Sequence, residues 1–265
     1  MSRESDVRPE ASKGRVKEYL TALALVVAAI MALGLWVIDG STIGPRTIRC
    51  RRMITVDTPE GKRFGASVVE SKISFPGGLT RAQGYAVLSK DQGEATVVDL
   101  GSRGLLFVTL ANEERLRNAG VHGSDFGCFS PFPREKFRGK VSTNVSANEE
   151  YAAYLDELNK QKPKGDVPFK YLPMLVRFLD LHNPASVERV EPSDLASSFG
   201  DGVEFESMSI EITDVPVTEN MTAALPWLAS DDSRRLVPQT QRSRDNSEIR
   251  SVDLLTYNDL RRLPK

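Results

Sequence analysis

The segment from His122 to Cys128 holds the side chains best suited to chemistry. A histidine can act as a general base near neutral pH, and a cysteine thiolate is a nucleophile. A nucleophile and its base usually come from distant parts of a chain, so closeness in sequence says little about catalysis. This segment supports an alternative hypothesis, in which the protein is a hydrolase or another enzyme. The sequence by itself assigns no catalytic residue.

Two further acid–base groups, Asp180 and His182, lie close together in the sequence. They fit either a hydrogen-bonded pair or a structural role before Asn183 and Pro184, and the structural role is the commoner one. With only two histidines in the chain, a site of several histidines is excluded. The motifs HExxH, GxSxG, GxxxxGK[ST] and GxGxxG and the calcium-loop pattern are all absent. We therefore predict no cofactor-binding residue and no metal ligand.

A group of phenylalanines surrounds the same segment: Phe126, Phe129, Phe132 and Phe137, with Pro131 and Pro133 between them. An exposed apolar loop of this kind recognises partner proteins. The other interpretation is a loop packed into the core, and we favour it. The carboxylates Glu204, Glu206 and Glu211 follow the alternation of a solvated strand face, and they need no active-site explanation.

The run from Leu20 to Ile38 is nineteen residues without a charge. At 1.5 Å per residue a helix of this length spans about 29 Å, close to the roughly 30 Å of a bilayer core. The apolar region of a signal peptide is shorter, about 7 to 15 residues, so we favour an uncleaved anchor. Residues 1–18 then form a tail, residues 19–38 a transmembrane helix, and residues 20–38 contact lipid.

The orientation of this helix follows from the cations beside it. Lys13, Arg15 and Lys17 precede the apolar run closely, whereas residues 39–44 contain no cation. Basic residues stay on the cytoplasmic side of a span. The sequence therefore predicts a cytoplasmic amino terminus and places the main domain outside the cytoplasm.

Charge and cysteine content narrow the classes of partner. The net charge of −1 and a pI near 6.2 disfavour nucleic-acid binding. A local group of cations, Arg46, Arg49, Arg51 and Arg52, fits either contact with anionic headgroups or, as we favour, the solvated face of a strand. Cys50 and Cys128 form one disulfide or stay unpaired and buried, and the sequence leaves both open. It also leaves the oligomeric state open.

The pattern of apolar residues predicts an α+β domain over residues 39–228, built mainly on antiparallel strands. Two hairpins are expected, at 47–58 with 63–75 and at 94–100 with 105–110. Residues 172–179 are apolar on both faces, which favours a central strand covered on both sides. Between 203 and 213 the apolar positions change parity, which predicts a β-bulge near Ser207.

Helices are expected to be few and short. Ser146 and Glu149 match a capping box, and the helix that follows should end at Pro163 and Gly165. Two shorter helices are predicted at 112–119 and 192–199. Residues 229–265 form a polar, partly disordered tail, whose last apolar residues, from Leu254 onward, are able to dock on the domain.

Several short strings occur in order along the chain, at 58–61, 93–101, 172–178, 184–195, 212–218 and 225–228. Together they resemble a group of bacterial single-pass membrane-anchored proteins with no assigned activity. The resemblance covers residues 47–228 and implies a bacterial inner-membrane location, without any catalytic residue. The sequence thus predicts a periplasmic binding or scaffolding module with a possible protein partner, rather than an enzyme.

Overall fold

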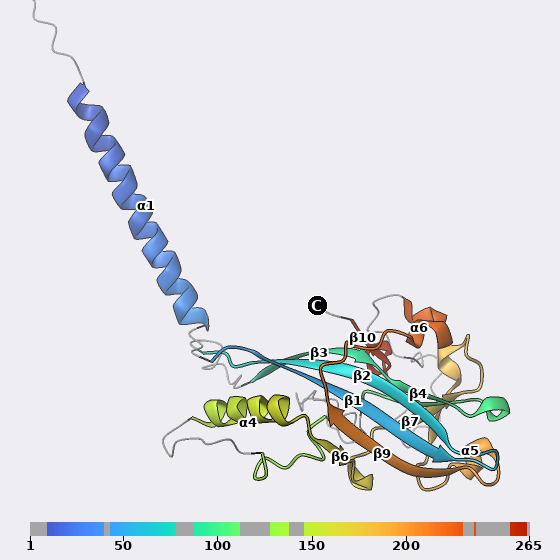
Figure 1. Cartoon of the computed structure of the whole chain (residues 1–265). Coiled ribbons are helices and arrows are strands. Elements are labelled where there is room, and N and C mark those ends of the chain that lie inside the picture. Colours follow the sequence, from blue (N-terminus) through green and yellow to red (C-terminus); the bar gives the residue numbers. More distant parts are fainter. Residues whose placement is uncertain are drawn as a thin grey trace, which may run out of the picture. The chain divides into compact units, whose positions relative to one another are not determined.

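The computed structural model describes residues 10–39, 43–77, 87–111, 128–137, 146–229, 236 and 255–263 (Figure 1). The chain divides into two units. The first comprises residues 1–44 and 75–88, and the second comprises residues 45–74 and 89–265. We describe each unit by itself.

The first unit contains the long helix α1 (Glu10–Asp39). Within it, Lys17–Gly34 is long and apolar enough to cross a membrane. Large apolar side chains such as Leu25 and Ile30 are exposed along this stretch. The hydroxyl of Thr21 donates to the carbonyl oxygen of Lys17 at 2.8 Å, which satisfies a polar group that would otherwise be costly in lipid. The predicted apolar helix is confirmed, and it is longer at both ends than the predicted span of 19–38.

The second unit begins with the predicted hairpin. Strand β1 (Arg46–Asp57) pairs antiparallel with β2 (Arg63–Ser74). The connection turns at Gly61, whose φ of 115° favours glycine and whose amide donates to the carbonyl oxygen of Thr58 at 2.9 Å. Local turn chemistry and alternating burial along β1 therefore explain this hairpin.

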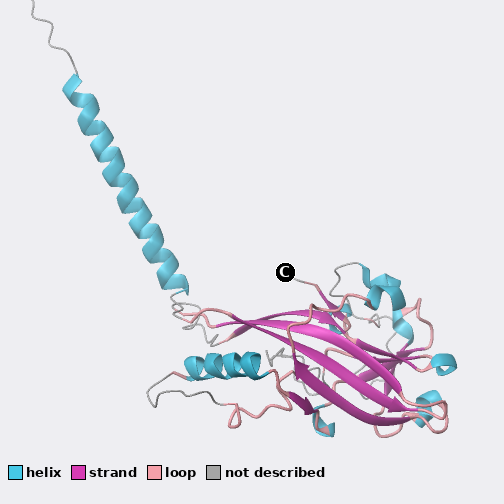
Figure 2. Ribbon diagram, viewed as in Figure 1, coloured by secondary structure: helices cyan, strands magenta, loops and turns pink. Residues whose placement is uncertain are grey.

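Two antiparallel sheets make up this unit, as predicted (Figure 2). The larger one has the order β10-β3-β2-β1-β9-β6 and adds β3 (Leu88–Glu94), β6 (Lys164–Asp166), β9 (Glu204–Ile212) and β10 (Arg261–Arg262). The smaller one has the order β4-β5-β7-β8, formed by β4 (Thr96–Asp99), β5 (Leu105–Val108), β7 (Leu175–Phe178) and β8 (Val187–Val190). The second predicted hairpin is the β4–β5 pair.

Two finer predictions about strands are also confirmed. Strand β7 lies inside its sheet, between β5 and β8, and Val176 on it is fully buried. In β9 the register against β1 shifts so that Thr55 faces Ser207 and Val56 faces Phe205. Glu206 is thus the extra residue of a bulge, next to the predicted position.

The two sheets approach each other closely where β2 meets β4. A Cβ added at Gly65 would overlap the carbonyl oxygen of Val97, so only glycine fits there. A hydrophobic core lies against the smaller sheet and contains Phe107, Val176, Met221 and Leu225. The rings of Phe107 and Phe178 meet edge to face at 5.2 Å within it.

The carboxyl-terminal residues complete the hydrophobic core beside the smaller sheet. Leu255 and Leu260 are fully buried in it. The amide of Ala95 donates to the carbonyl oxygen of Leu260 at 2.7 Å, and β10 pairs with β3. The buried carboxylate of Glu94 forms an ion pair with Arg261 at 3.1 Å. The predicted docking of the last apolar residues is therefore confirmed.

Among the described residues, the remaining helices are short, apart from α4 (Ala147–Gln161). They are η1 (Gly101–Arg103), η2 (Phe169–Tyr171), η3 (Pro184–Ser186), α5 (Ala196–Phe199), α6 (Met221–Ala224), η4 (Pro226–Ala229) and η7 (Tyr257–Asp259). Helix α5 covers only the second half of the predicted 192–199 segment. The predicted helix at 112–119 lies outside the described residues.

Helix α4 has the predicted capping box. The hydroxyl of Ser146 accepts from the amide of Glu149 at 3.3 Å, and the Glu149 carboxylate accepts from the Ser146 amide at 2.7 Å. The helix then buries Leu155 and Leu158. It ends at Lys162, which adopts the left-handed conformation with φ of 48°. This end agrees with the predicted stop at Pro163.

Replacing Ser146 with alanine should lower the free energy of unfolding by about 1 kcal/mol, because the amide of Glu149 loses its cap. Urea unfolding of the full chain in detergent measures this change. Ser102→Ala is the control, because Ser102 is exposed in η1, and it should shift stability by less than about 0.5 kcal/mol. Equal effects of the two substitutions would contradict the capping role.

The same cap predicts a pH dependence. Hydrogen bonds from the Ser146 backbone amide and then its hydroxyl lower the pKa of Glu149. The cap therefore stabilises the folded state above the ordinary carboxyl pKa, and this contribution disappears as pH falls through the lowered value. Glu149→Gln should remove that part of the acid destabilisation in urea unfolding measured at several pH values. An unchanged pH profile would refute it.

Candidate functional site

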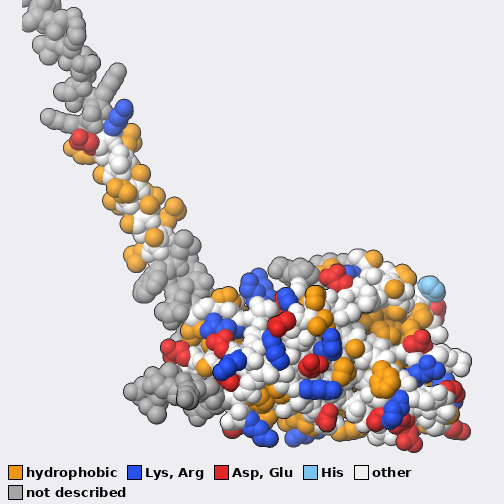
Figure 3. All heavy atoms as spheres, viewed as in Figure 1, with side chains coloured by type: hydrophobic (Ala, Val, Ile, Leu, Met, Phe, Trp, Pro, Cys, Tyr) orange, Lys and Arg blue, Asp and Glu red, His pale blue; other side chains and the backbone are white. Residues whose placement is uncertain are grey.

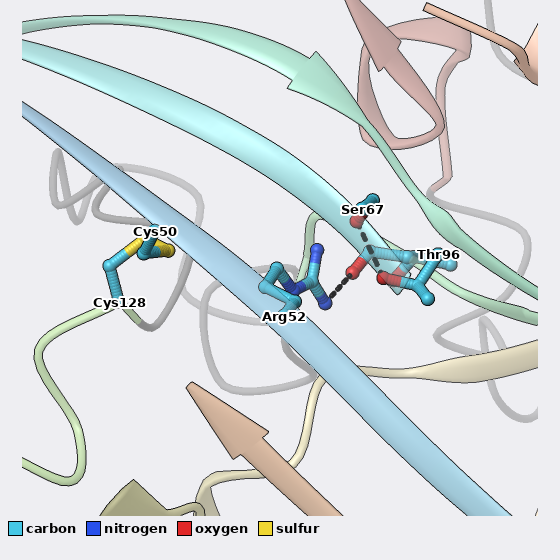
Figure 4. The surroundings of a disulfide bond; sticks show 6 residues. Cys50, Arg52, Ser67, Thr96 and Cys128 are labelled. Carbon is cyan, nitrogen blue, oxygen red and sulfur yellow. Dashed lines mark hydrogen bonds between the residues drawn. A yellow bond between two sulfur atoms is a disulfide. The ribbon is translucent and has the colours of Figure 1, made fainter. Parts of the chain in front are cut away.

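The predicted catalytic segment does not supply a thiol nucleophile. His122 and Asp125 lie outside the described residues. Cys128 forms a disulfide with Cys50 of β1, and both cysteines are buried (Figure 4). The hypothesis of a Cys128 nucleophile is therefore wrong for this oxidised state, because the sulfur is already bonded. Of the two alternatives for the cysteines, the disulfide is the one observed.

The described phenylalanines of the neighbouring loop pack into the protein. Phe132 is buried and meets Phe137 edge to face at 5.6 Å. Phe129 lies 6.1 Å from the ring of Tyr154, whose hydroxyl donates to the carbonyl oxygen of Phe132 at 2.7 Å. The core-packing interpretation is confirmed for Phe132, and Phe129 and Phe137 are half-buried against their ring partners. Phe126 lies outside the described residues.

Asp180 and His182 form a turn rather than a catalytic pair. The Asp180 carboxylate accepts from the backbone amide of His182 at 2.9 Å, and the His182 side chain is exposed. Asn183 then caps η3 by accepting from the amide of Ala185 at 3.0 Å. The structural role before Asn183 and Pro184 is confirmed.

The predicted solvated face of four arginines is wrong at one position. Arg49 and Arg51 are partly exposed and pair with Glu70 and Glu211. Arg52 instead lies on the inward face of β1 with Cys50 and is fully buried. Figure 4 shows its guanidinium on the side of Ser67 and Thr96, between the sheets. Successive side chains of a strand point to opposite faces, so Arg52 points inward with Cys50 and Ile54 although it is charged.

The buried guanidinium of Arg52 is incompletely bonded. Its Nη2 donates to the carbonyl oxygen of Thr109 at 2.9 Å, whereas Nε and Nη1 have no hydrogen-bond partner among the described residues. Burial lowers the pKa of Arg52 to about 10. No described group of His, Cys, Asp and Glu residues has the arrangement of a metal site. Arg52 is thus a costly interior charge without a recognised ligand.

The described surface is hollowed beside β9, where a groove of about 650 Å³ lies. Its lining residues come from three separate segments: Asp166, Val167 and Phe169; Pro192 to Ala196; and Val203 to Met208. Leu195, Val203 and Met208 are buried and form an apolar floor. Phe169 is 55% exposed and meets Phe205 edge to face at 6.1 Å, so an aromatic side chain stands open to solvent at the groove.

The groove exists because β6 is short. Strand β6 pairs with Ser209–Glu211 of β9, and the amide of Val167 extends the contact to the carbonyl oxygen of Met208. Pro168 follows and leads the chain into η2, since proline cannot donate to a ladder. Among the described strands, none pairs with residues 204–207 of β9 on this side. This stretch of the edge of the larger sheet therefore has no described strand beside it on the groove side; Figure 1 shows β6 ending along β9.

The groove is acidic. Four of its lining residues are carboxylates, Asp166, Asp194, Glu204 and Glu206, and none is Lys or Arg. Elsewhere the surface is mixed, and the face shown in Figure 3 carries basic and acidic side chains side by side. This concentration of one sign of charge in a concave site makes the groove attractive to cations.

Most of this negative charge is not neutralised. The carboxylates of Asp166 and Glu204 are exposed and form no hydrogen bond or ion pair with the described residues. The Asp194 carboxylate accepts from the backbone amide of Ser197. Glu206 binds Lys62 at 2.5 Å, and this contact, followed by one from Asp57, raises the pKa of that lysine. Within the part of the chain that the structure describes, three of the four carboxylates thus lack a cationic partner.

Comparison of the chain with protein-family models, curated proteins and solved structures found no match.

The sequence did not predict the groove. Glu204 and Glu206 were assigned to an ordinary solvated strand face, and they are exposed as that assignment requires. What the assignment missed is the open edge beside them. Two local features of the sequence were related to this open edge: the parity change near Ser207, which marks the bulge in β9, and Pro168, which follows the short strand β6. Neither feature shows that residues 192–196 form the opposite wall.

Proposed function

We propose that the protein is a binding module held at the outer face of a bacterial inner membrane by a single helix. Residues 17–34 of α1 would lie in the bilayer, with the amino terminus in the cytoplasm and the second unit in the periplasm. The groove beside β9 would be its binding surface. The resemblance found in the sequence supports the bacterial origin.

The disulfide between Cys50 and Cys128 is the observation that carries this proposal. Disulfides form and persist in oxidising compartments such as the bacterial periplasm, and they are rare in the cytosol. The only two cysteines of the chain are used in it. A periplasmic second unit agrees with the orientation favoured by Lys13, Arg15 and Lys17.

The composition of α1 supports the anchor. Its candidate span has a mean hydropathy of 1.6 over 18 residues, and these side chains are exposed in the isolated chain. In water such a surface would be costly, and in lipid it is favourable. A bilayer is therefore the environment that suits this helix.

Binding is favoured over catalysis by the character of the site. The described lining of the groove contains carboxylates and two aromatic side chains but no histidine, cysteine or lysine that would serve as a nucleophile or base with them. The competing enzyme hypothesis depended on the thiol of Cys128, which the disulfide occupies.

Protease accessibility tests this proposal. Cells that produce the full chain with an amino-terminal epitope are converted to spheroplasts and treated with external protease. We expect the second unit to be digested while a short epitope-bearing fragment stays in carbonate-washed membranes. Protection of the second unit in intact spheroplasts, followed by digestion after lysis, would refute the orientation. Recovery of the full chain in the carbonate supernatant would refute the anchor.

A further inference from the structure

We propose that the groove beside β9 binds an extended, basic peptide segment, which adds to the larger sheet as a further strand next to residues 204–207. This inference names the class of partner that the proposed binding module would bind. It rests on the proposed function only for the place where binding occurs, the periplasm.

The open edge of β9 determines the conformation of the partner. Backbone groups at a strand edge pair readily with another extended chain. Strand β6 stops at Asp166, so no described strand pairs with residues 204–207 on the groove side. At about 3.3 Å per residue this open stretch accommodates roughly four paired residues. A peptide laid along it would continue the line of β6.

The walls and floor explain why the edge serves binding. Charges and bulges on edge strands also protect sheets from aggregation, and a bulge is present at Glu206. A merely protected edge needs no hollow beside it. Here the edge lies in a groove with Leu195, Val203 and Met208 beneath and Phe169 exposed at its side. Alternate side chains of a paired strand point to one face, so an apolar residue in the peptide would reach this floor.

The charge of the groove determines the charge of the partner. Asp166, Asp194 and Glu204 have no cationic partner among the described residues. Nucleic acids and anionic headgroups would be repelled by them, whereas lysine and arginine side chains would be attracted. A second copy of this chain, paired edge to edge about a twofold axis, would bring the same carboxylates together. Charge complementarity therefore favours a basic peptide from another protein.

The test uses the full chain in detergent and fluorescein-labelled hexapeptides in which lysine alternates with valine, leucine, phenylalanine or tyrosine. Fluorescence anisotropy at about 0.15 M salt measures binding. We expect at least one of these peptides to bind at least tenfold more tightly than its counterpart with glutamate in place of lysine. Equal binding of the two, or binding of neither, would overturn the proposal.

Backbone pairing is tested separately. The same peptide with N-methyl groups on alternate amides retains its charge but cannot pair as a strand on one edge. Alternate amides of a strand point to opposite edges of that strand. One peptide is therefore methylated on its odd amides and a second on its even amides, so that each edge of the peptide is blocked in one of them. At least one of them should lose tenfold or more in affinity. Undiminished binding of both would overturn strand addition, since electrostatic attraction alone would then be sufficient.

Substitutions locate the site. Glu204→Lys and Asp166→Lys should each weaken binding of the lysine peptide about tenfold, and Glu204→Gln should weaken it less. Glu219→Lys is the control, because Glu219 is exposed and lies outside the lining. Circular dichroism of each variant verifies folding. Equal weakening by Glu204→Lys and Glu219→Lys would overturn the site. These assays use purified protein, so their result is independent of membrane orientation, which protease accessibility tests.

Discussion

Replacing Cys50 and Cys128 together with serine should lower the free energy of unfolding by about 4 kcal/mol. The two cysteines are 78 residues apart. Closing a loop of that length removes conformational entropy from the unfolded chain, by about 4 kcal/mol in the chain-entropy account. The bond also holds the loop of residues 128–137 against β1, so we expect the largest stability loss among the changes considered.

Urea unfolding of the full chain in detergent measures this loss. Reduction of the natural protein should produce the same decrease, and the double serine variant should be insensitive to reductant. These two results separate the loss of the bond from any effect of the serine side chains. A decrease below about 1 kcal/mol in both cases would show that the bond contributes little to the fold.

Replacing Arg52 with methionine should raise the free energy of unfolding by about 2 kcal/mol. Burial lowers the pKa of Arg52 from its ordinary value to about 10, which corresponds to a penalty of about 3 kcal/mol for the protonated group. The hydrogen bond to Thr109 offsets about 1 kcal/mol of it. Methionine is flexible enough to fill the same space without charge. Apolar replacement of incompletely bonded interior ions is stabilising in other proteins.

The control for this prediction lies on the same strand. Arg51 is partly exposed, and its ion pair with Glu211 is long at 3.9 Å. Arg51→Met should therefore change the free energy of unfolding by less than about 1 kcal/mol. The gain in the free energy of unfolding from Arg52→Met should be equal at about pH 7 and pH 9, because the guanidinium is protonated in both the folded and the unfolded protein at these pH values. The gain in stability should shrink as pH rises above about 10, because the folded state loses the Arg52 proton at a lower pH than the unfolded state does. Destabilisation by Arg52→Met would show that the guanidinium has a role in the fold.

Features encoded by neighbouring residues were predicted from the sequence. The β1–β2 hairpin follows from its turn residues and alternation, and the capping box of α4 follows from Ser146 and Glu149. The bulge at Glu206 follows from a parity change within one strand. Each depends on interactions over a few residues, where side-chain type and spacing determine the geometry.

Features that depend on distant residues were not predicted. Sequence gave no distance between Cys50 and Cys128, so their pairing stayed open until the structure brought them together. Arg52 was expected on the solvated face of a strand together with Arg46, Arg49 and Arg51, whereas the observed alternation of β1 places it inward and buries it. The groove needs residues 166–169, 192–196 and 203–208 side by side, and no local pattern indicates that arrangement.

The central claim is that a disulfide-bonded domain stands outside the cytoplasm on a membrane helix. The most direct measurement is thiol trapping in living cells that produce the full chain. Cells are quenched with acid, and carbonate-washed membranes are treated with a mass-adding alkylating reagent before or after reduction. We predict no added mass without reduction and two additions per chain after it. Two additions without reduction would place both cysteines in a reducing compartment and contradict the account.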